Sequence, residues 1–158
     1  MGVGKTTLGT ALATRLGLSF LDSDAGIEAE HGRTGAEIAR EDGVAVLHEM
    51  ELEVFVRMAS SVERVVIAPA ASVVDRDEGR RLLDEHFTVW LRVPPDVAGE
   101  RRATSSHRRP IDDEEQQHRD ESRRRWLANL ADIEVDNTRP LDSVVDEVAV
   151  DVEQMLDT

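Results

Sequence analysis

The sequence contains no cysteine and no tyrosine among its 158 residues, and aromatic residues make up only 3% of it. Without cysteine, neither disulfide bonds nor thiolate metal sites are available to stabilise the chain. With so few aromatic side chains, the core must be built from valine, leucine, isoleucine and alanine. A chain of this length is large enough to form one domain around such a core, so we expect a single domain over residues 1–158.

Basic residues are also scarce. The 19 basic and 33 acidic residues give a net charge of −14. This excess of negative charge argues against nucleic acid or an anionic membrane surface as the main partner. No hydrophobic run approaches the length of a membrane span and no secretory signal is recognisable, so we expect a cytoplasmic protein with no membrane contact. We also expect a monomer.

The one lysine of the sequence lies in its most informative stretch, Met-Gly-Val-Gly-Lys-Thr-Thr at residues 1–7. Gly4-Lys5-Thr6 matches the end of the phosphate-binding loop G-x-x-x-x-G-K-[ST], whose first glycine would fall before Met1. In such a loop, backbone amides surround phosphate oxygens and the positive end of the following helix adds to them. Lys5 would reach the β- and γ-phosphates, and Thr6 would offer its hydroxyl to Mg²⁺. The alternative is a glycine-rich helix start without a ligand.

Hydrophobic spacing along the rest of the chain predicts alternating helices and strands. Leucines four residues apart indicate a first helix, and the run Val65-Val66-Ile67 is typical of a buried strand in a parallel sheet. Strands that alternate with helices predict an α/β domain. The expected helices are residues 6–16, 25–31, 34–40, 44–60, 78–86, 96–102, 115–131 and 144–156. The expected strands are residues 18–21, 62–68, 88–92 and 133–136.

Two aspartates, Asp22 and Asp24, follow the first expected strand. In open α/β sheets, ligands bind at the carboxyl ends of the strands. One carboxylate would therefore hold Mg²⁺ through water, and the other would face a substrate hydroxyl. The alternative is that Asp24 only caps the helix at residues 25–31.

Arginines gather in one part of this acidic chain: eight of the eighteen lie between Arg101 and Arg125. The cluster predicts an arginine-bearing loop that closes over phosphates, neutralises their charge and excludes water. The alternative is a helix surface with glutamate–arginine pairs, which we prefer for Arg119, Arg124 and Arg125.

Taken in order, these pieces resemble the shikimate kinase family across nearly the whole chain. The resemblance is carried by residues 2–7, Phe20-Leu21-Asp22-Ser23-Asp24, Ile27-Glu28, Gly32 to Ile38, Gly43, His48, Glu51, Arg109-Pro110, Arg123 and Ala131-Asp132. It implies a three-layer P-loop kinase fold like that of nucleoside monophosphate kinases, with helices on both faces of a parallel sheet and a lid at about residues 103–118. The first strand of that sheet, which is central, would be absent from this chain.

The resemblance also implies an activity, the ATP-dependent transfer of the γ-phosphate to a hydroxyl of shikimate or a related carboxylated acceptor, in aromatic amino acid biosynthesis. Phosphoryl transfer mainly requires positioning and charge neutralisation, which these residues would supply. By position, the ATP site would comprise Gly2, Val3, Gly4, Lys5, Thr6, Thr7, Arg102 and Arg109, and the Mg²⁺ site would comprise Thr6 and Asp22. The acceptor site would comprise Asp24, His48, Ala70, Ala71 and Arg123, and the catalytic residues would be Lys5, Asp24 and Arg109.

Three departures from the family pattern fall in the acceptor half. His48 replaces an arginine that clamps the acceptor carboxylate, and it cannot form the two-pronged contact of a guanidinium. Residues 68–72, Ala-Pro-Ala-Ala-Ser, replace a Gly-Gly-Gly turn, where any positive φ becomes costly. Trp126-Leu127 replaces a dipeptide that usually contains tyrosine. Three hypotheses stay open: a shikimate kinase, a kinase with another acceptor, and an ATP-binding protein without transferase activity.

The absent strand has a consequence of its own. Its two neighbours would each keep an unpaired edge, which is hard to tolerate inside a domain. We favour the interpretation that the start of the chain is assigned too late. We therefore expect the 158-residue chain alone to be poorly soluble or weakly folded, and an upstream extension to restore stability. Cooperative melting at high temperature would count against this expectation.

Overall fold

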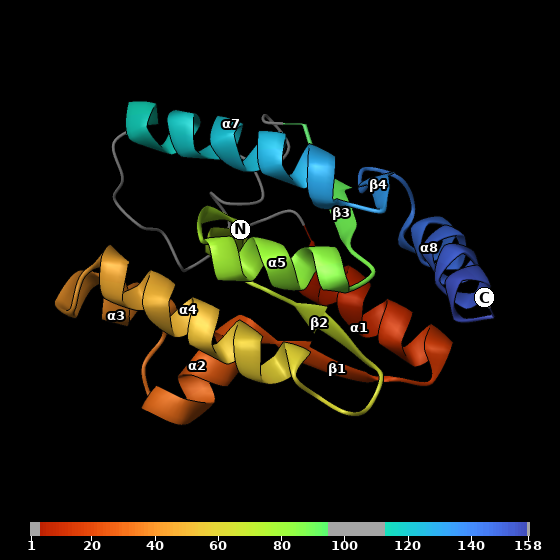
Figure 1. Cartoon of the computed structure of the whole chain (residues 1–158), viewed down its shortest axis with the longest axis horizontal. Coiled ribbons are helices and arrows are strands. Elements are labelled where there is room, and N and C mark those ends of the chain that lie inside the picture. The colour runs from red at the N-terminus through yellow and green to blue at the C-terminus, as the bar shows by residue number, and fades with distance from the viewer. Residues whose placement is uncertain (1–3, 95–112, 158) are drawn as a thin grey trace.

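The computed structural model describes residues 4–94 and 113–157 (Figure 1). The helices are Lys5–Leu16 (α1), Ser23–His31 (α2), Gly35–Glu41 (α3), Val44–Ala59 (α4), Asp77–Glu85 (α5), Asp113–Leu130 (α7) and Leu141–Leu156 (α8), with a 3₁₀ turn at Ala71–Asp75 (η1). The strands are Ser19–Asp22 (β1), Val65–Ala68 (β2), Val89–Arg92 (β3) and Ile133–Asp136 (β4). Over these two ranges, no helix is long and apolar enough to cross a membrane.

The predicted alternation of strands and helices is confirmed. One correction concerns α2, which begins at Ser23 because Asp22, and not Asp24, is its N-cap. The Asp22 carboxylate accepts hydrogen bonds from the first-turn amides, which the helix itself leaves without partners. The 3₁₀ turn η1 was not predicted, and the helix expected at residues 96–102 lies outside the described residues.

The strands form two separate parallel pairs. β1 pairs with β2, with Ser19 opposite Val65, and β3 pairs with β4, with Val89 opposite Ile133. Parallel neighbours need a crossover connection, and the helices between the paired strands supply it. β2 reads Val-Val-Ile-Ala without a polar residue, as expected of a strand covered on both faces.

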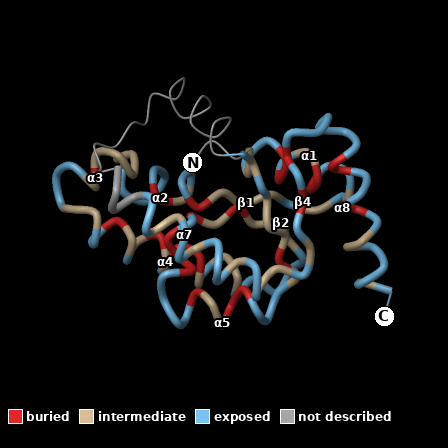
Figure 2. The backbone as a smooth tube through the Cα atoms, turned by 90° about the horizontal axis from the view of Figure 1, so that it is seen from above, coloured by how far each residue is buried: buried red, intermediate tan, exposed pale blue. Residues whose placement is uncertain are grey.

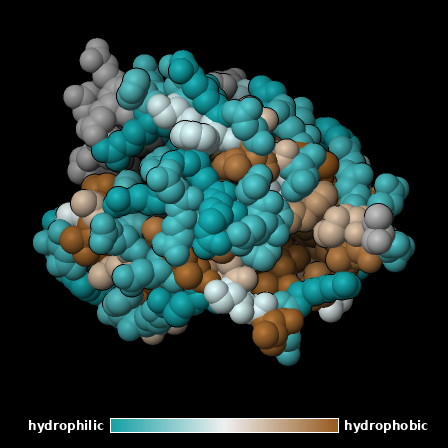
Figure 3. Space-filling model, in the orientation of Figure 1, coloured by the Kyte–Doolittle hydropathy of each residue, from teal (hydrophilic) through white to brown (hydrophobic). Residues whose placement is uncertain are grey.

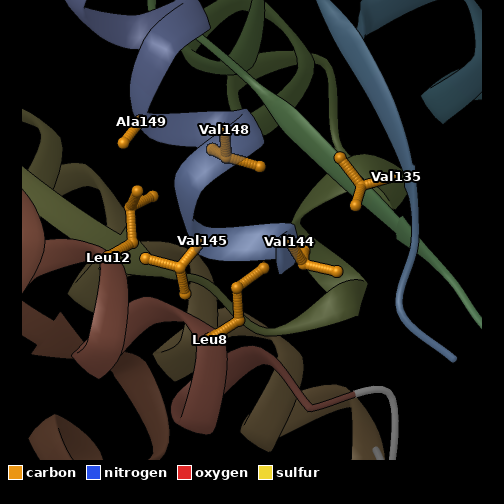
Figure 4. Packing of buried hydrophobic residues seen from close by; sticks show 7 residues of the cluster. All are labelled: Leu8, Leu12, Val135, Val144, Val145, Val148 and Ala149. Atoms are coloured by element: carbon orange, nitrogen blue, oxygen red, sulfur yellow. The ribbon is translucent and has the colours of Figure 1, made fainter. Parts of the chain in front are cut away.

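Helices cover both faces of these strands, so the domain has three layers. On one face, α1 and α8 meet around Leu8, Leu12 and Val148 (Figure 4), and strand residues from β2, β3 and β4 pack against this same cluster. On the other face, α4, η1, α5 and α7 enclose a second cluster that contains Phe55 and Val73. Because the first cluster touches both strand pairs, one hydrophobic core joins the two halves.

A third cluster fixes the position of α4. Ile27 of α2, Ile38 of α3 and Leu47 of α4 are each at most 1% exposed. Figure 2 shows such buried positions recurring along the helices, separated by exposed ones, as expected of amphipathic segments. α4 is therefore held from both sides, by α2 and α3 and by η1 and α5.

A cavity of about 1060 Å³ separates the two strand pairs. Its walls include every residue of β2 and every residue of β3, with Leu12 of α1 on one side and Phe55 and Leu127 on the other. In Figure 3, a hollow lined by hydrophobic atoms opens on the face turned toward the viewer. In the described part of the chain, β2 and β3 each have one strand neighbour and no strand lies between them, in agreement with the predicted absence of a central strand.

Candidate functional site

The N-terminus of α1 is built to receive an anion. Gly4 is the N-cap, with φ of 86°, a left-handed conformation that glycine adopts without steric cost. No side chain caps this end of the helix and no acidic residue lies in its first turn. The first-turn amides and the helix dipole therefore present positive potential at this end.

Lys5 connects this helix end to the carboxyl end of β2. Its Nζ donates a hydrogen bond of 2.6 Å to the carbonyl oxygen of Pro69, directly after β2. Burial lowers the pKa of Lys5 below the ordinary lysine value, although the carboxylates of Asp24, Asp22 and Glu51 act to raise it. Acidic groups near the ammonium thus balance part of its charge.

Asp22 joins three elements at one point. Its Oδ2 accepts a hydrogen bond of 2.6 Å from the Thr6 hydroxyl, and its Oδ1 accepts from the amides of Asp24 and Ala25 at 2.9 and 3.3 Å. The hydrogen bonds hold the carboxylate at the end of β1 beside the first turn of α1.

The Thr6 and Asp22 oxygens are suitable ligands for a magnesium ion whose other ligands are water and phosphate oxygens. Mg²⁺ usually takes one or two protein oxygens and completes its octahedron with waters and phosphate oxygens. Residues 4–94 and 113–157 contain no cluster of three or more acidic, histidine or cysteine side chains that would hold a metal without such help. The geometry therefore suits a metal that arrives with a nucleotide.

Asp24 lies exposed in the first turn of α2, where it does not cap the helix. Among the nearby carboxylates, it exerts the largest upward effect on the pKa of Lys5. Its carboxylate is therefore close to the ammonium and open to solvent, which leaves it available to a hydroxylated ligand.

A buried polar pair was missed in the sequence. Glu51 of α4 is 4% exposed, and Ser72 of η1, 5% exposed, donates a hydrogen bond to its carboxylate. One signal was available: Glu51 follows Leu47 by one helical turn, on the buried stripe of α4. A glutamate on that stripe indicates a structural or functional polar contact. His48, also on α4, is partly exposed and does not line the cavity.

The backbone after β2 accommodates residues other than glycine. Ala70 has φ of −63° and ψ of 147° and is 7% exposed, and Ala71 begins η1. No non-glycine residue in the described ranges has a positive φ. The strain considered for an alanine-containing turn here therefore does not arise. Both alanines line the cavity together with Lys5 and Arg123.

Arg123 of α7 forms an ion pair with Asp75, the last residue of η1. Its Nε donates to Asp75 Oδ1 at 3.0 Å and its Nη2 donates to Oδ2 at 2.6 Å. The Arg123 side chain is only 13% exposed, and that of Asp75 is 34% exposed. A two-pronged, partly buried pair of this kind is stronger than an ordinary surface pair.

The segment that carries Asp75 is held by α5 and α7. The Arg80 guanidinium donates to the carbonyl of Val74 at 2.7 Å and lies 4.1 Å from the centre of the Trp126 ring. Gly79 approaches the Val73 carbonyl so closely that a Cβ would collide with it. Trp126, in the dipeptide that departs from the family pattern, thus helps to clamp η1 against α7.

The remaining predicted site residues divide into two groups. Thr7 is described, and it is exposed in the first turn of α1. Gly2, Val3, Arg102, Arg109 and most of the expected lid at residues 103–118 lie outside the described residues. α7 begins at Asp113, so the C-terminal end of that range is helical.

Parallel strands with an open helix N-terminus, a lysine and a threonine–aspartate pair at their carboxyl ends define a P-loop kinase fold. The family model described as shikimate kinase matches residues 1–153. The chain therefore belongs to the shikimate kinase family.

Similar proteins agree with this assignment. The shikimate kinase of Symbiobacterium thermophilum is 36% identical over 112 residues, which are 70% of this chain and 64% of that protein. The shikimate kinase of Synechococcus elongatus is 38% identical over 112 residues, 70% of this chain and 57% of that protein. The matched region thus spans about three fifths of these relatives.

Solved structures extend the similarity over more of the chain. Shikimate kinase from Acinetobacter baumannii in complex with shikimate superposes with a TM-score of 0.80 and 26% identity, covering 99% of this chain and 88% of that one. Shikimate kinase from Aquifex aeolicus gives a TM-score of 0.81 and 29% identity, covering 97% and 92%.

Proposed function

We propose that this protein catalyses the ATP-dependent phosphorylation of a hydroxyl of shikimate. The observation that carries the proposal is the convergence of Lys5, the Thr6–Asp22 pair and Asp24 at the carboxyl ends of β1 and β2. These groups match the needs of phosphoryl transfer, which are charge neutralisation and alignment of two reactants. Family membership supports shikimate as the acceptor, and one structural neighbour was solved with shikimate bound.

In this proposal the nucleotide and the metal occupy the α1 end of the site. Lys5 and the first-turn amides bind the triphosphate, and Thr6 and Asp22 hold Mg²⁺, Asp22 through a water molecule. On sequence grounds, Gly2, Val3, Gly4 and Thr7 complete the loop, and Arg102 and Arg109 approach the nucleotide from the lid.

The acceptor occupies the other end of the site. Asp24 accepts a hydrogen bond from the attacking hydroxyl and orients or deprotonates it. Arg123 pairs with the acceptor carboxylate, beside Ala70, Ala71 and His48. We further infer a monomeric enzyme in the cytoplasm that serves aromatic amino acid biosynthesis, with sedimentation velocity as the test of the monomer.

A coupled assay for ADP release tests this function. We expect release that requires both shikimate and Mg²⁺ and is abolished by Lys5→Ala or Asp24→Ala. Thr10→Ala is the control, because the Thr10 hydroxyl only donates to a backbone carbonyl of its own helix. A folded chain that does not bind Mg·ATP in a titration would overturn the proposal.

A second candidate is the same transfer to a different hydroxylated acid. Two features favour it. Pro69, Ala70 and Ala71 line the cavity where the family has glycines, and histidine at position 48 replaces the arginine of the family pattern. This candidate predicts ATP binding without shikimate turnover, and ADP release with another compound in a screen of hydroxylated carboxylic acids. ATP binding with no turnover on any acceptor would instead indicate a nucleotide-binding protein without transferase activity.

A further inference from the structure

The Arg123 guanidinium uses only part of its hydrogen-bonding capacity on Asp75. A guanidinium has five N–H donors, and this ion pair engages the edge formed by Nε and Nη2. One Nη1 hydrogen and the second Nη2 hydrogen form another edge, which suits a second two-pronged contact with a carboxylate. In the described part of the chain, Asp75 is the partner that fixes the orientation of the group.

Asp75 is itself held in place on a rigid segment. The buried Ser72–Glu51 hydrogen bond fixes the start of η1, and the Arg80 contact with the Val74 carbonyl fixes its end. A free arginine side chain samples many rotamers, and fixing them costs conformational entropy on ligand binding. A carboxylate anchored in this way removes that cost before any ligand arrives.

Arg123 also faces the site. It lines the same cavity as Lys5 and Ala70, and its positive charge contributes to lowering the pKa of Lys5. The two cations are therefore close enough to repel each other. The Asp75 carboxylate reduces this repulsion and holds the guanidinium on the η1 side.

We propose that Asp75 is a positioning residue, which orients Arg123 so that its second edge binds the carboxylate of the phosphoryl acceptor. This inference rests on the proposed function, because it assumes a carboxylated acceptor at Arg123. It assigns to Asp75 an effect on acceptor affinity and little effect on the nucleotide or on the chemical step.

Steady-state kinetics with Asp75→Asn and Asp75→Ala test the inference. We expect the KM for shikimate to rise about tenfold, while kcat and the KM for ATP stay within about threefold. Asp146→Asn is the matched control. It removes the same charge from a side chain that is 71% exposed and pairs with Arg15, outside η1, α5 and α7. An unchanged KM for shikimate would overturn the inference. A lower KM would also overturn it, because Asp75 would then compete with the acceptor for Arg123.

A second measurement separates this inference from the proposed function. The Arg123 Nε–H group should give a slowly exchanging NMR signal, assigned by its loss in Arg123→Lys. We expect Asp75→Asn to shift and broaden this signal in a protein that melts as the parent does. If the parent neither binds nor phosphorylates shikimate, the proposed function fails. In that case, an NMR signal that depends on Asp75 would limit the role of Asp75 to orienting Arg123. If the Arg123 Nε–H signal is unchanged in Asp75→Asn, the inference itself is overturned.

Discussion

The proposed nucleotide end and the proposed acceptor end of the site differ in how they are assembled. Most of the proposed nucleotide end comes from residues 4–25, where a helix N-terminus and a helix cap place Thr6 and Asp22, while the Lys5 ammonium also reaches the distant Pro69 carbonyl after β2. The proposed acceptor end combines α2, α4, η1 and α7, which meet through packing and through side-chain pairs that are distant in the sequence. Local structure therefore fixes most of one end, apart from the Lys5 contact with Pro69, and tertiary contacts fix the other.

This difference suggests how each end can change. The backbone amides of a helix end remain whatever the neighbouring side chains are. The acceptor end depends on particular pairs, such as Ser72 with Glu51 and Asp75 with Arg123, so single substitutions alter it. We expect variants of the two ends to separate nucleotide effects from acceptor and stability effects.

The largest expected effect is at the nucleotide end. Lys5→Met should lower kcat/KM by at least about 100-fold, because it removes a preorganised positive charge from the transferring phosphoryl group. Its melting temperature should stay near that of the parent, since the α1 cap is made by backbone groups. Lys5→Arg should keep part of the ATP affinity, measured by calorimetry. A Lys5→Met variant with normal turnover would contradict the assignment of Lys5 to the nucleotide end, and with it the comparison of the two ends.

At the acceptor end, Gly79→Ala should destabilise the fold by about 1–3 kcal/mol, because its Cβ would collide with the backbone carbonyl of Val73. Gly26→Ala is the matched control on α2. Its Cβ would meet the flexible tip of Met58 at 2.9 Å and Val54 Cγ1 at 3.1 Å but no backbone atom, and helix propensity offsets part of this crowding, so we expect less than about 1 kcal/mol. Urea unfolding measures both. Equal losses would show that the packing of η1 on α5 is not special.

A smaller loss is expected for the buried polar pair. Ser72→Ala should lower the free energy of unfolding by about 1–2 kcal/mol, because a buried carboxylate loses a donor. The same change in a Glu51→Gln background should cost less, since the carboxylate charge is gone. Ser60→Ala is the control, because its exposed hydroxyl only donates to the Val56 carbonyl. A double-mutant cycle at Glu51 and Ser72, measured by thermal unfolding, tests this account. If the two substitutions have additive effects on stability, the account is contradicted.

The smallest expected effect is on pH dependence. Burial lowers the pKa of Lys5, so the ammonium loses its proton at a lower pH than an ordinary lysine does. ATP affinity should therefore fall as the pH rises through this lowered pKa. Between the two pKa values the unfolded chain binds more protons than the folded chain, so the free energy of unfolding should rise with pH over the same window. Lys5→Arg should remove the pH dependence of both ATP affinity and the free energy of unfolding. If both quantities rose or both fell with pH in the parent protein, the assignment of these effects to Lys5 would be contradicted.

The sequence predicted much of the fold, and it singled out Lys5, Thr6 and Asp22, which the structure brings together at the N-terminus of α1. Periodicity gave the element order, because apolar stripes and runs are local patterns. It misplaced the α2 cap, since Asp22 and Asp24 are equally good caps by residue type. It missed Asp75 because an aspartate beside an arginine in a polar stretch carries no sign of a partner 48 residues away. Glu51 was recognised as part of the family pattern, but its burial and its contact with Ser72 were indicated only by its place on an apolar stripe.

The cavity between β2 and β3 offers two facing rows of backbone groups to any extended apolar segment that can enter it. A short valine-rich peptide in excess should therefore bind the monomeric domain, as measured by fluorescence anisotropy, whereas a proline-substituted peptide should not. The same space that interrupts the sheet would thus make the domain an acceptor for one added strand.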